Sequence, residues 1–394
     1  MSIDSVYLRL CTTSVFGGVL KKPLFEKFFK YAEAKSYEKI KAYGEFVAEI
    51  YEQGANLTDA VRNIVFEDEN VYVKSISLKK HIPENIENAV VNELENFGAF
   101  ASLCIKDFKL DIKSKVGVDI SALPSFESDK IDLRGEYKKR ISNIEKYGYG
   151  IFASRAMFSL SDTGEIEPIE SADKIQLDNF IGYSDERQKV YDNTEAFLMG
   201  KPAANVLLYG DAGTGKSSSV KAIVNHFFDE GLRLIEIRKN QLLLLPKVMA
   251  KISKNPLKFI IFIDDLSFNV NDDNFSMLKA ALEGSAASKA ENAVIYATSN
   301  RRHIIKESFG DRDGDDVHRN DTIAETLSLS ERFGLVVFFS KPEKKLYLEI
   351  VHALAKRFNI DMPVEQLDVD AEAFALKRGY RSARCAEQFI KSLI

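Results

Sequence analysis

Cysteine and histidine are scarce in this sequence of 394 residues, which contains only three cysteines and five histidines. The cysteines Cys11, Cys104 and Cys385 lie far apart and form no C-x-x-C pair, and the histidines are equally scattered. The spacing of the cysteines indicates neither a disulfide framework nor a zinc site.

Long hydrophobic runs are also missing. No apolar stretch approaches the roughly 18 residues of a membrane-spanning helix. The start, "MSIDSVYLRLCTTSVFGG", has no basic n-region and no long apolar h-region. We therefore expect a protein of the reducing cytoplasm that does not insert into membranes.

An excess of positive charge is missing as well. The net charge is -5 and the isoelectric point is near 5.8, which argues against bulk attraction to nucleic acid or acidic lipid and leaves room for a local basic patch. A hydrophobic fraction of 45% and a charged fraction of 29% are typical of soluble globular proteins. The chain is long enough for two or three domains.

The N-terminal part, residues 1–110, predicts a helical domain. Phe25, Phe28, Tyr43 and Phe46 recur there at helical spacing, and no cluster in this region indicates chemistry. A domain built for packing or partner contact is the interpretation we favour. Residues 111–175 predict a connector, in which "GIFASRAMFSLSDTGEIEPI" reads as two short strands around a turn.

From residue 176 onward, near-continuous hydrophobic strands alternate with helices. The strands are "NVLLYG", "LRLIEIR", "KFIIFI", "NAVIYATS" and "GLVVFFS". A helix broken near Pro246 is expected after the second of them. This rhythm predicts an α/β core over 176–340, with a parallel sheet covered by helices on both faces. Residues 341–394 predict an all-helical C-terminal lid.

The stretch "GDAGTGKS" fits the pattern G-x-x-x-x-G-K-[ST], with a strand before it and a helix after it. The glycines let backbone N–H groups approach phosphate oxygens, and the following helix adds its positive end. We expect Lys216 to reach the β- and γ-phosphates of ATP and Ser217 to bind Mg²⁺. The nucleotide-binding residues expected here are Gly210, Asp211, Ala212, Gly213, Thr214, Gly215, Lys216, Ser217 and Ser218.

Two adjacent carboxylates, Asp264 and Asp265, follow the strand "KFIIFI". In P-loop NTPases a carboxylate at the end of a buried strand holds Mg²⁺, and Asp264 suits that role. An unpaired carboxylate at a buried strand end costs free energy unless a cation or hydrogen bonds satisfy it. The alternative is that either residue caps a helix, which is the more open possibility for Asp265.

Further motifs resemble those of AAA+ ATPases. Asn300, which closes "YATSN", is similar to sensor 1, the polar residue that orients the attacking water. "LSERFG" resembles the arginine-finger box, which implies that Arg332 acts on ATP bound by a neighbouring subunit. "RGYRSARCAEQF" resembles sensor 2, with Arg384 the better match and Arg381 the alternative.

These arginines have simpler interpretations too. Arg332 can form a surface ion pair with Glu331, as exposed charges often do. Arg301, Arg302 and His303 directly follow Asn300 and form either a contact with phosphate, a subunit or nucleic acid, or a solvated basic tip.

The segment "LDNFIGYSDERQKVYDNTEAFLMG" resembles the part of AAA+ proteins that covers the adenine, with Phe180, Ile181 and Gly182 as the implied contacts. More narrowly, this segment with "GDAGTGKSS", "DDLSF", "YATSNRRHI" and "LSLSERFGL" resembles the bacterial AAA-type family named domain of unknown function 815. The resemblance covers roughly residues 120–394 and implies the fold and ATP site, but no substrate.

Asp265 stands where most AAA+ motors have the glutamate that polarises the attacking water. The missing methylene withdraws the carboxylate by about one C–C bond, whereas a general base works within about 2.6–3.2 Å of its proton. A displacement near 1 Å costs about 10²-fold in rate. Asp265 therefore implies slow turnover, an adjusted backbone, or another base such as Glu283.

The sequence as a whole predicts a P-loop NTPase of AAA+ type with a helical lid and a mainly helical N-terminal domain. We expect an ATPase that uses ATP and Mg²⁺ and works as a homo-oligomer. Its task would be to remodel or load an unknown protein or nucleic-acid client. The alternative is a nucleotide-gated switch with very slow hydrolysis. A small-molecule P-loop kinase is the weakest alternative, because Asn300, Arg332 and the lid would then have no purpose.

Overall fold

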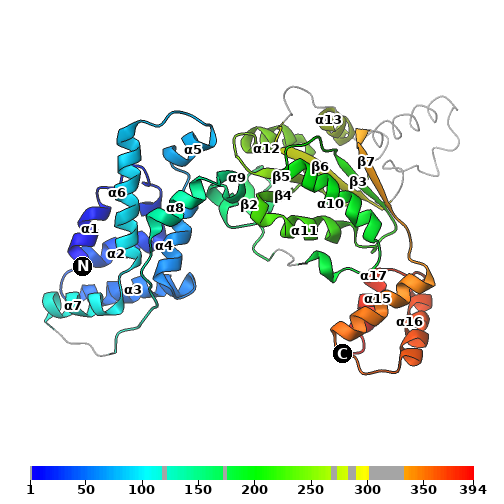
Figure 1. The fold of residues 1–394 in the computed structure, drawn as a ribbon. Coiled ribbons are helices and arrows are strands. Elements are labelled where there is room, and N and C mark those ends of the chain that lie inside the picture. Colours follow the sequence, from blue (N-terminus) through cyan, green and yellow to red (C-terminus); the bar gives the residue numbers. More distant parts are fainter. Residues whose placement is uncertain (1, 118–121, 172–174, 268–272, 283–289, 301–331) are drawn as a thin grey trace. The chain divides into compact units, whose positions relative to one another are not determined.

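The computed structural model describes residues 2–117, 122–171, 175–267, 273–282, 290–300 and 332–394 (Figure 1). By their mutual contacts the residues form two compact units. The N-terminal unit comprises Met1–Ser154 and Lys254–Pro256, and the C-terminal unit comprises Arg155–Ser253 and Leu257–Ile394. In the described part of the chain, no helix is both long enough and apolar enough to cross a membrane.

The N-terminal unit is helical in the ranges that the structure describes. Its α-helices are α1 (Ile3–Leu10), α2 (Pro23–Glu33), α3 (Glu38–Glu52), α4 (Leu57–Phe66), α5 (Val71–Ser77), α6 (Glu84–Ala101), α7 (Ile105–Val116), α8 (Leu133–Ile141) and α9 (Ile144–Tyr147). Aromatic rings fill its centre, with the ring centroids of Phe28 and Phe100 4.5 Å apart and those of Phe25 and Phe100 5.0 Å apart. The helical spacing of the phenylalanines thus builds one buried core.

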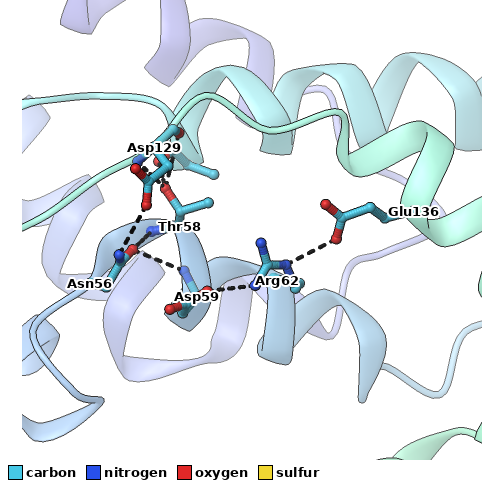
Figure 2. A network of polar contacts seen from close by, with 7 residues as sticks. Asn56, Thr58, Asp59, Arg62, Asp129 and Glu136 are labelled. Atoms are coloured by element: carbon cyan, nitrogen blue, oxygen red, sulfur yellow. Dashed lines mark hydrogen bonds and ion pairs between the residues drawn. The ribbon is translucent and has the colours of Figure 1, made fainter.

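A polar network fixes the start of α4 to the segment that leads into α8 (Figure 2). The Asn56 side chain caps α4 by accepting from the backbone N–H groups of Thr58 and Asp59. The Thr58 hydroxyl exchanges hydrogen bonds with the backbone of Asp129, at 3.1 and 2.8 Å. Arg62 pairs with Asp59 and with Glu136 on α8, at 2.5 and 3.0 Å. The polar groups of this network therefore satisfy one another.

The C-terminal unit contains a seven-stranded sheet in the order β2-β1-β4-β5-β6-β3-β7. Its strands are β1 (Met157–Leu160), β2 (Ile166–Pro168), β3 (Val206–Gly210), β4 (Leu232–Glu236), β5 (Lys258–Ile263), β6 (Ala293–Ser299) and β7 (Leu335–Phe339). All neighbouring pairs are parallel except β1 with β2. The predicted parallel sheet is confirmed, and the predicted hairpin joins its edge.

Helices cover both faces of this sheet. Figure 1 shows α10 (Ser184–Leu198) and α11 (Lys216–His226) on one side and α12 (Leu245–Ile252) and α13 (Asp273–Leu282) on the other. The break expected near Pro246 is confirmed: the segment divides into a 3₁₀ helix, Lys239–Leu244, and α12, which has Pro246 in its first turn. Proline lacks a backbone N–H, which the first turn of a helix does not use, so it starts the helix here.

A helical lid follows β7. It consists of α15 (Lys344–Arg357), α16 (Val364–Arg378) and α17 (Ala383–Lys391), which share a core that includes Tyr347, Val351 and Phe389. The Tyr347 hydroxyl donates to the backbone carbonyl of Ala371 at 3.1 Å and so joins α15 to α16.

Candidate active site

The phosphate-binding loop connects the carboxyl end of β3 to the start of α11. Gly213 and Gly215 adopt φ angles of 76° and 92°, in the region that favours glycine, and Gly215 is the N-cap of α11. The Thr214 hydroxyl donates to the carbonyl of Asp211 at 2.9 Å and braces the turn. Ser217 and Ser218 lie in the first turn of α11. This places the loop at a helix N-terminus, where backbone N–H groups and the helix dipole attract anions.

Lys216 is buried beneath the loop, with 5% of its surface exposed. Its Nζ donates to the carbonyls of Gly210 and Asp211 at 2.9 and 2.7 Å and to Asn300 Oδ1 at 3.2 Å. Burial lowers the pKa of Lys216, while nearby carboxylates including that of Asp264 oppose this effect. The ammonium group is thus held among neutral oxygens at the place where phosphate would arrive.

Asp264 lies directly after β5 and contacts two hydroxyls. Its Oδ1 accepts from Ser217 Oγ at 2.6 Å and from Thr298 Oγ1 at 2.5 Å. The residue is exposed although β5 before it is buried, so these hydrogen bonds form at the open carboxyl end of the strand. A hydroxyl and a carboxylate side by side are hard oxygen ligands that suit Mg²⁺, so Ser217 and Asp264 fit this ion.

Asp265 is also exposed and has a φ of 51°, in the left-handed region. Its Oδ1 accepts from Asn300 Nδ2 at 2.8 Å, and Asn300 directly follows β6. Neither aspartate caps a helix, because residues 264 and 265 form a turn and residues 266 and 267 after them are not helical. The helix-cap alternative is therefore wrong for both, and Asn300 bridges Asp265 and Lys216.

The lid closes one side of the phosphate-binding loop. The backbone N–H of Arg384 donates to the carbonyl of Gly213 at 3.2 Å. A Cβ on Gly213 would lie 3.0 Å from Ser382 Oγ, which shows how closely the lid approaches. A cavity of about 200 Å³ lies here. It is lined by Asp211, Ala212, Gly213, Lys341, Tyr380, Arg381, Ser382 and Arg384.

The two sensor 2 candidates differ in their partners. Arg381 forms a two-pronged ion pair with Glu372 on α16, at 2.9 and 2.7 Å. This pairing lowers the pKa of the Glu372 carboxyl. Arg384 is exposed at the start of α17 and faces the same cavity. The ion pair with Glu372 makes Arg381 a structural support, which leaves Arg384 as the better candidate for phosphate contact.

The segment expected to cover the adenine lies between the loop and the lid. The Phe180 ring lies near Gly215, whose Cβ would be 3.7 Å from Phe180 Cε1. Ile181 packs against the core of the lid, and Gly182 is so close to Leu346 of α15 that a Cβ would lie 2.4 Å from Leu346 Cδ1. The structure thus brings this segment beside the loop.

Tyr183 anchors the same segment by donating its hydroxyl to the carbonyl of Ser340 at 2.6 Å. Burial raises the pKa of Tyr183 to about 12, so the hydroxyl stays protonated and can keep donating.

Arg332 does not join this cluster. It lies just before β7, whose last residue Phe339 is paired with Gly210. The five residues of β7, at about 3.3 Å per residue, separate the two ends of the strand by roughly 13 Å. Arg332 therefore lies at the amino end of these strands, opposite to the carboxyl end that carries its own phosphate-binding loop.

Several residues named from the sequence lie outside the described residues. These are Glu283, Arg301, Arg302, His303 and Glu331.

Sequence reasoning missed two residues of the site. Thr298 contacts both aspartates, and Ser382, which is 1% exposed, caps α17 and faces Gly213. Ser382 had a detectable signal, because a serine before a helical pattern is a common N-cap. Thr298 had none, because its partners depend on the pairing of distant strands.

In the parallel sheet, β6 lies between β3, which leads into the phosphate-binding loop, and β5, which leads into Asp264 and Asp265. Together with the loop and the helical lid, this order defines a P-loop NTPase fold of AAA+ type. The family described as "Protein of unknown function (DUF815)" matches residues 153–394, and the chain belongs to this family.

Solved structures give a weaker likeness. The RuvB Holliday junction branch migration motor of Thermotoga maritima is 18% identical, with a TM-score of 0.38; the match covers 56% of this chain and 64% of that one. Two single-residue variants of that protein are 19% identical with TM-scores of 0.39, at the same coverage. The matched region is thus less than two thirds of those chains. A search of the curated proteins found no match.

Proposed function

We propose that this protein binds ATP with Mg²⁺ and hydrolyses it to ADP and phosphate. The observation that supports this best is the meeting of Lys216, Ser217, Asp264, Asp265 and Asn300 at the carboxyl edge of β3, β5 and β6. These residues come from three separate parts of the chain, and together they offer a cation, two carboxylates and an amide beside a phosphate-binding loop.

The chain's own groups bind the triphosphate first. The backbone N–H groups of the loop and the positive end of α11 receive the β-phosphate. Lys216 exchanges its contacts with the carbonyls of Gly210 and Asp211 for phosphate oxygens, a stronger, charge-assisted interaction. Phe180 and Ile181 cover the adenine, and Arg384 reaches the γ-phosphate from the lid.

Ser217 and Asp264 would hold Mg²⁺, Asp264 through water. The bound ion supplies positive charge that stabilises the charge developing on the phosphate oxygens.

Asp265 serves as the general base for the attacking water, and Asn300 orients that water. The water oxygen forms a bond to the γ-phosphorus while its proton passes to the Asp265 carboxylate. The bond from the γ-phosphorus to the bridging oxygen breaks, and the electron pair leaves with ADP. Asn300 Nδ2 donates to Oδ1 of that carboxylate, and a carboxylate has a second oxygen that can accept the proton.

Arg332 completes the site of a neighbouring copy. Its position at the amino end of β7 argues against contact with the loop of its own chain, since an arginine side chain is shorter than the strand that separates them. A homo-oligomer in which Arg332 stabilises the charge on the adjacent γ-phosphate satisfies this geometry. The coupled task is remodelling or loading of a protein or nucleic-acid client, selected by the N-terminal unit.

A second candidate is a nucleotide-gated switch with very slow hydrolysis. The hydrogen bond of 2.8 Å from Asn300 to Asp265 favours it, because in this arrangement the Asn300 amide donates to the carboxylate and not to an attacking water. In this case ATP holds one conformation of the lid, and hydrolysis only resets it.

Mixing two inactive variants tests the shared site. Lys216→Ala destroys the loop but keeps Arg332, whereas Arg332→Ala does the reverse. A mixture of the two should recover part of the ATPase activity, because one interface then contains an intact loop and an intact finger. Arg357→Ala, on the exposed end of α15, is the matched arginine control and should keep full activity. Failure to recover activity would contradict a finger supplied in trans.

Turnover separates the two candidates. Specific activity that rises with protein concentration supports the oligomeric ATPase, whereas flat activity near zero supports the switch. Asp265→Asn should bind ATP and hydrolyse it at a much reduced rate. An unchanged rate would remove Asp265 from the mechanism.

A further inference from the structure

Thr298, near the end of β6, contacts three consecutive residues beyond β5. Its hydroxyl donates to Asp264 Oδ1 at 2.5 Å and accepts from the backbone N–H of Asp265 at 2.9 Å. Its carbonyl accepts from the backbone N–H of Leu266 at 2.7 Å. Thr298 is 2% exposed, so this hydroxyl works in a setting sheltered from water.

The Thr298 hydroxyl forms its hydrogen bonds at the point where the regular pairing of β5 with β6 ends. The ladder between β5 and β6 runs through the pair Ile263 and Ala297, and Asp264 and Asp265 then leave it. Asp265 turns into the left-handed region with a φ of 51°. This conformation is uncommon for residues other than glycine, and aspartate and asparagine tolerate it best because their short side chains bond locally. Strained backbone of this kind persists where neighbouring groups hold it.

We propose that Thr298 is a positioning residue for hydrolysis, whose hydroxyl fixes the left-handed turn that presents the Asp265 carboxylate to the site. The inference rests on the proposed ATPase function and explains how an aspartate works in the place of a longer glutamate. The same hydroxyl bonds the Asp264 side chain and the Asp265 backbone. It therefore also fixes the distance between the carboxylate that would bind Mg²⁺ and the carboxylate that acts as the general base.

The left-handed turn favours aspartate over glutamate at position 265. With this backbone conformation, the Asp265 carboxylate lies 2.8 Å from Asn300 Nδ2. A glutamate on the same turn would extend past this position and would fit the left-handed backbone less well. Asp265→Glu should therefore lower the rate of hydrolysis, although glutamate is the residue that most AAA+ motors carry.

The test compares three threonine variants of the full chain. Thr298→Val removes the hydroxyl at nearly constant shape and should lower kcat about 10- to 100-fold with a smaller change in KM, as a misplaced base does. Thr298→Ser keeps the hydroxyl and should restore most of kcat. Thr194→Val is the matched control, because it removes another fully buried hydroxyl. That hydroxyl donates to the carbonyl of Val190 at 2.7 Å and bonds the Tyr296 hydroxyl of β6 at 2.8 Å, so the control also perturbs this strand without touching either aspartate. It should leave kcat unchanged even where it lowers stability.

A crystal structure of Thr298→Val gives a readout that does not depend on hydrolysis. We expect Asp265 to leave the left-handed region and its carboxylate to separate from Asn300. An unchanged turn at Asp265, a Thr298→Ser variant as impaired as Thr298→Val, or a faster Asp265→Glu enzyme would each overturn the inference. If the wild-type protein hydrolyses no ATP at any protein concentration, the proposed ATPase function fails, and the conformation of Asp265 in Thr298→Val still decides the role of Thr298.

Discussion

Each unit of this protein buries a lysine, and the two lysines are bonded differently. In the N-terminal unit, Lys39 is fully buried and its Nζ lies 3.3 Å from Asp111 Oδ2, with a further bond to the carbonyl of Tyr31 at 2.9 Å. In the C-terminal unit, Lys216 is nearly as buried, and the three acceptors of its Nζ are neutral oxygens. Burial lowers the pKa of both.

The difference separates a structural charge from one that is available for a ligand. The charge of Lys39 is matched by the Asp111 carboxylate, which also accepts from the Tyr31 hydroxyl at 2.8 Å. The charge of Lys216 has no such direct match among its three acceptors, and an incoming phosphate would supply one. Burial alone therefore does not mark a functional lysine; the kind of acceptor does.

The largest effect on stability is expected for Lys39→Met, which tests whether the charge of this lysine is structural. Removing Lys39 leaves Asp111 with Lys115, at 3.0 Å, as its remaining cation and takes the donor away from the buried carbonyl of Tyr31. We expect the N-terminal unit to lose about 1–3 kcal/mol of stability. Hydrogen exchange resolved by residue should show the loss in α2 and α3, with ATP binding retained. Lys30→Met is the control, because Lys30 pairs with Glu45 at the surface and should change stability by less than about 1 kcal/mol. Equal, small effects would contradict a structural role for Lys39.

The opposite result is expected for Lys216→Met. ATP hydrolysis should fall by about 10²- to 10³-fold, the usual effect of removing one donor that stabilises developing charge. Stability should not fall, because the variant no longer buries an ammonium group that has only neutral acceptors. Lys221→Met on the same helix, which removes a partly exposed pair with Glu236, should leave hydrolysis unchanged. A large loss of stability in Lys216→Met would make this lysine resemble Lys39 after all.

Much of the fold could be predicted from the sequence because strands and the loop leave local patterns. The pattern "KFIIFI" predicts a strand, and the structure has β5 at Lys258–Ile263. The motif "GDAGTGKS" connects β3 to α11, as its flanking residues indicate. The position of the hairpin could not be predicted from such patterns, because whether β1 pairs with β4 depends on contacts between distant segments.

The candidate site was predicted in its residue types but not in its geometry. The exposure of Asp264, the left-handed turn at Asp265 and the bonds of Thr298 all follow from how β5 and β6 align. No local pattern in "DDLSF" or "YATSN" encodes that alignment. The same limit applies to Arg332, whose distance from the loop follows from the parallel pairing of β3 and β7.

Alkaline pH should sharpen the difference between the two lysines. Burial lowers the pKa of free Lys216 below its ordinary value of 10.5, whereas bound phosphate favours its charged form and raises that pKa. ATP binding then takes up a proton, so affinity should fall as pH rises above the pKa of the free protein, by up to about tenfold per pH unit. Calorimetric titration with ATP checks this dependence. Lys216→Met should bind weakly with no such fall, and an equal slope in that variant would assign the proton to another group.

The smallest effect expected concerns the polar network of Figure 2, in which polar groups satisfy one another as they do around Lys39. Asn56→Ala removes the side-chain acceptor for two N–H groups at the start of α4 and should cost about 0.5–2 kcal/mol. Asn56→Ser keeps a capping oxygen and should recover most of the loss. Because the network lies within the N-terminal unit, kcat for ATP should be the same in both variants as in the wild type. If kcat changed in step with stability, the N-terminal unit would also control ATP hydrolysis in the C-terminal unit. The polar network would then have a role in catalysis as well as in stability.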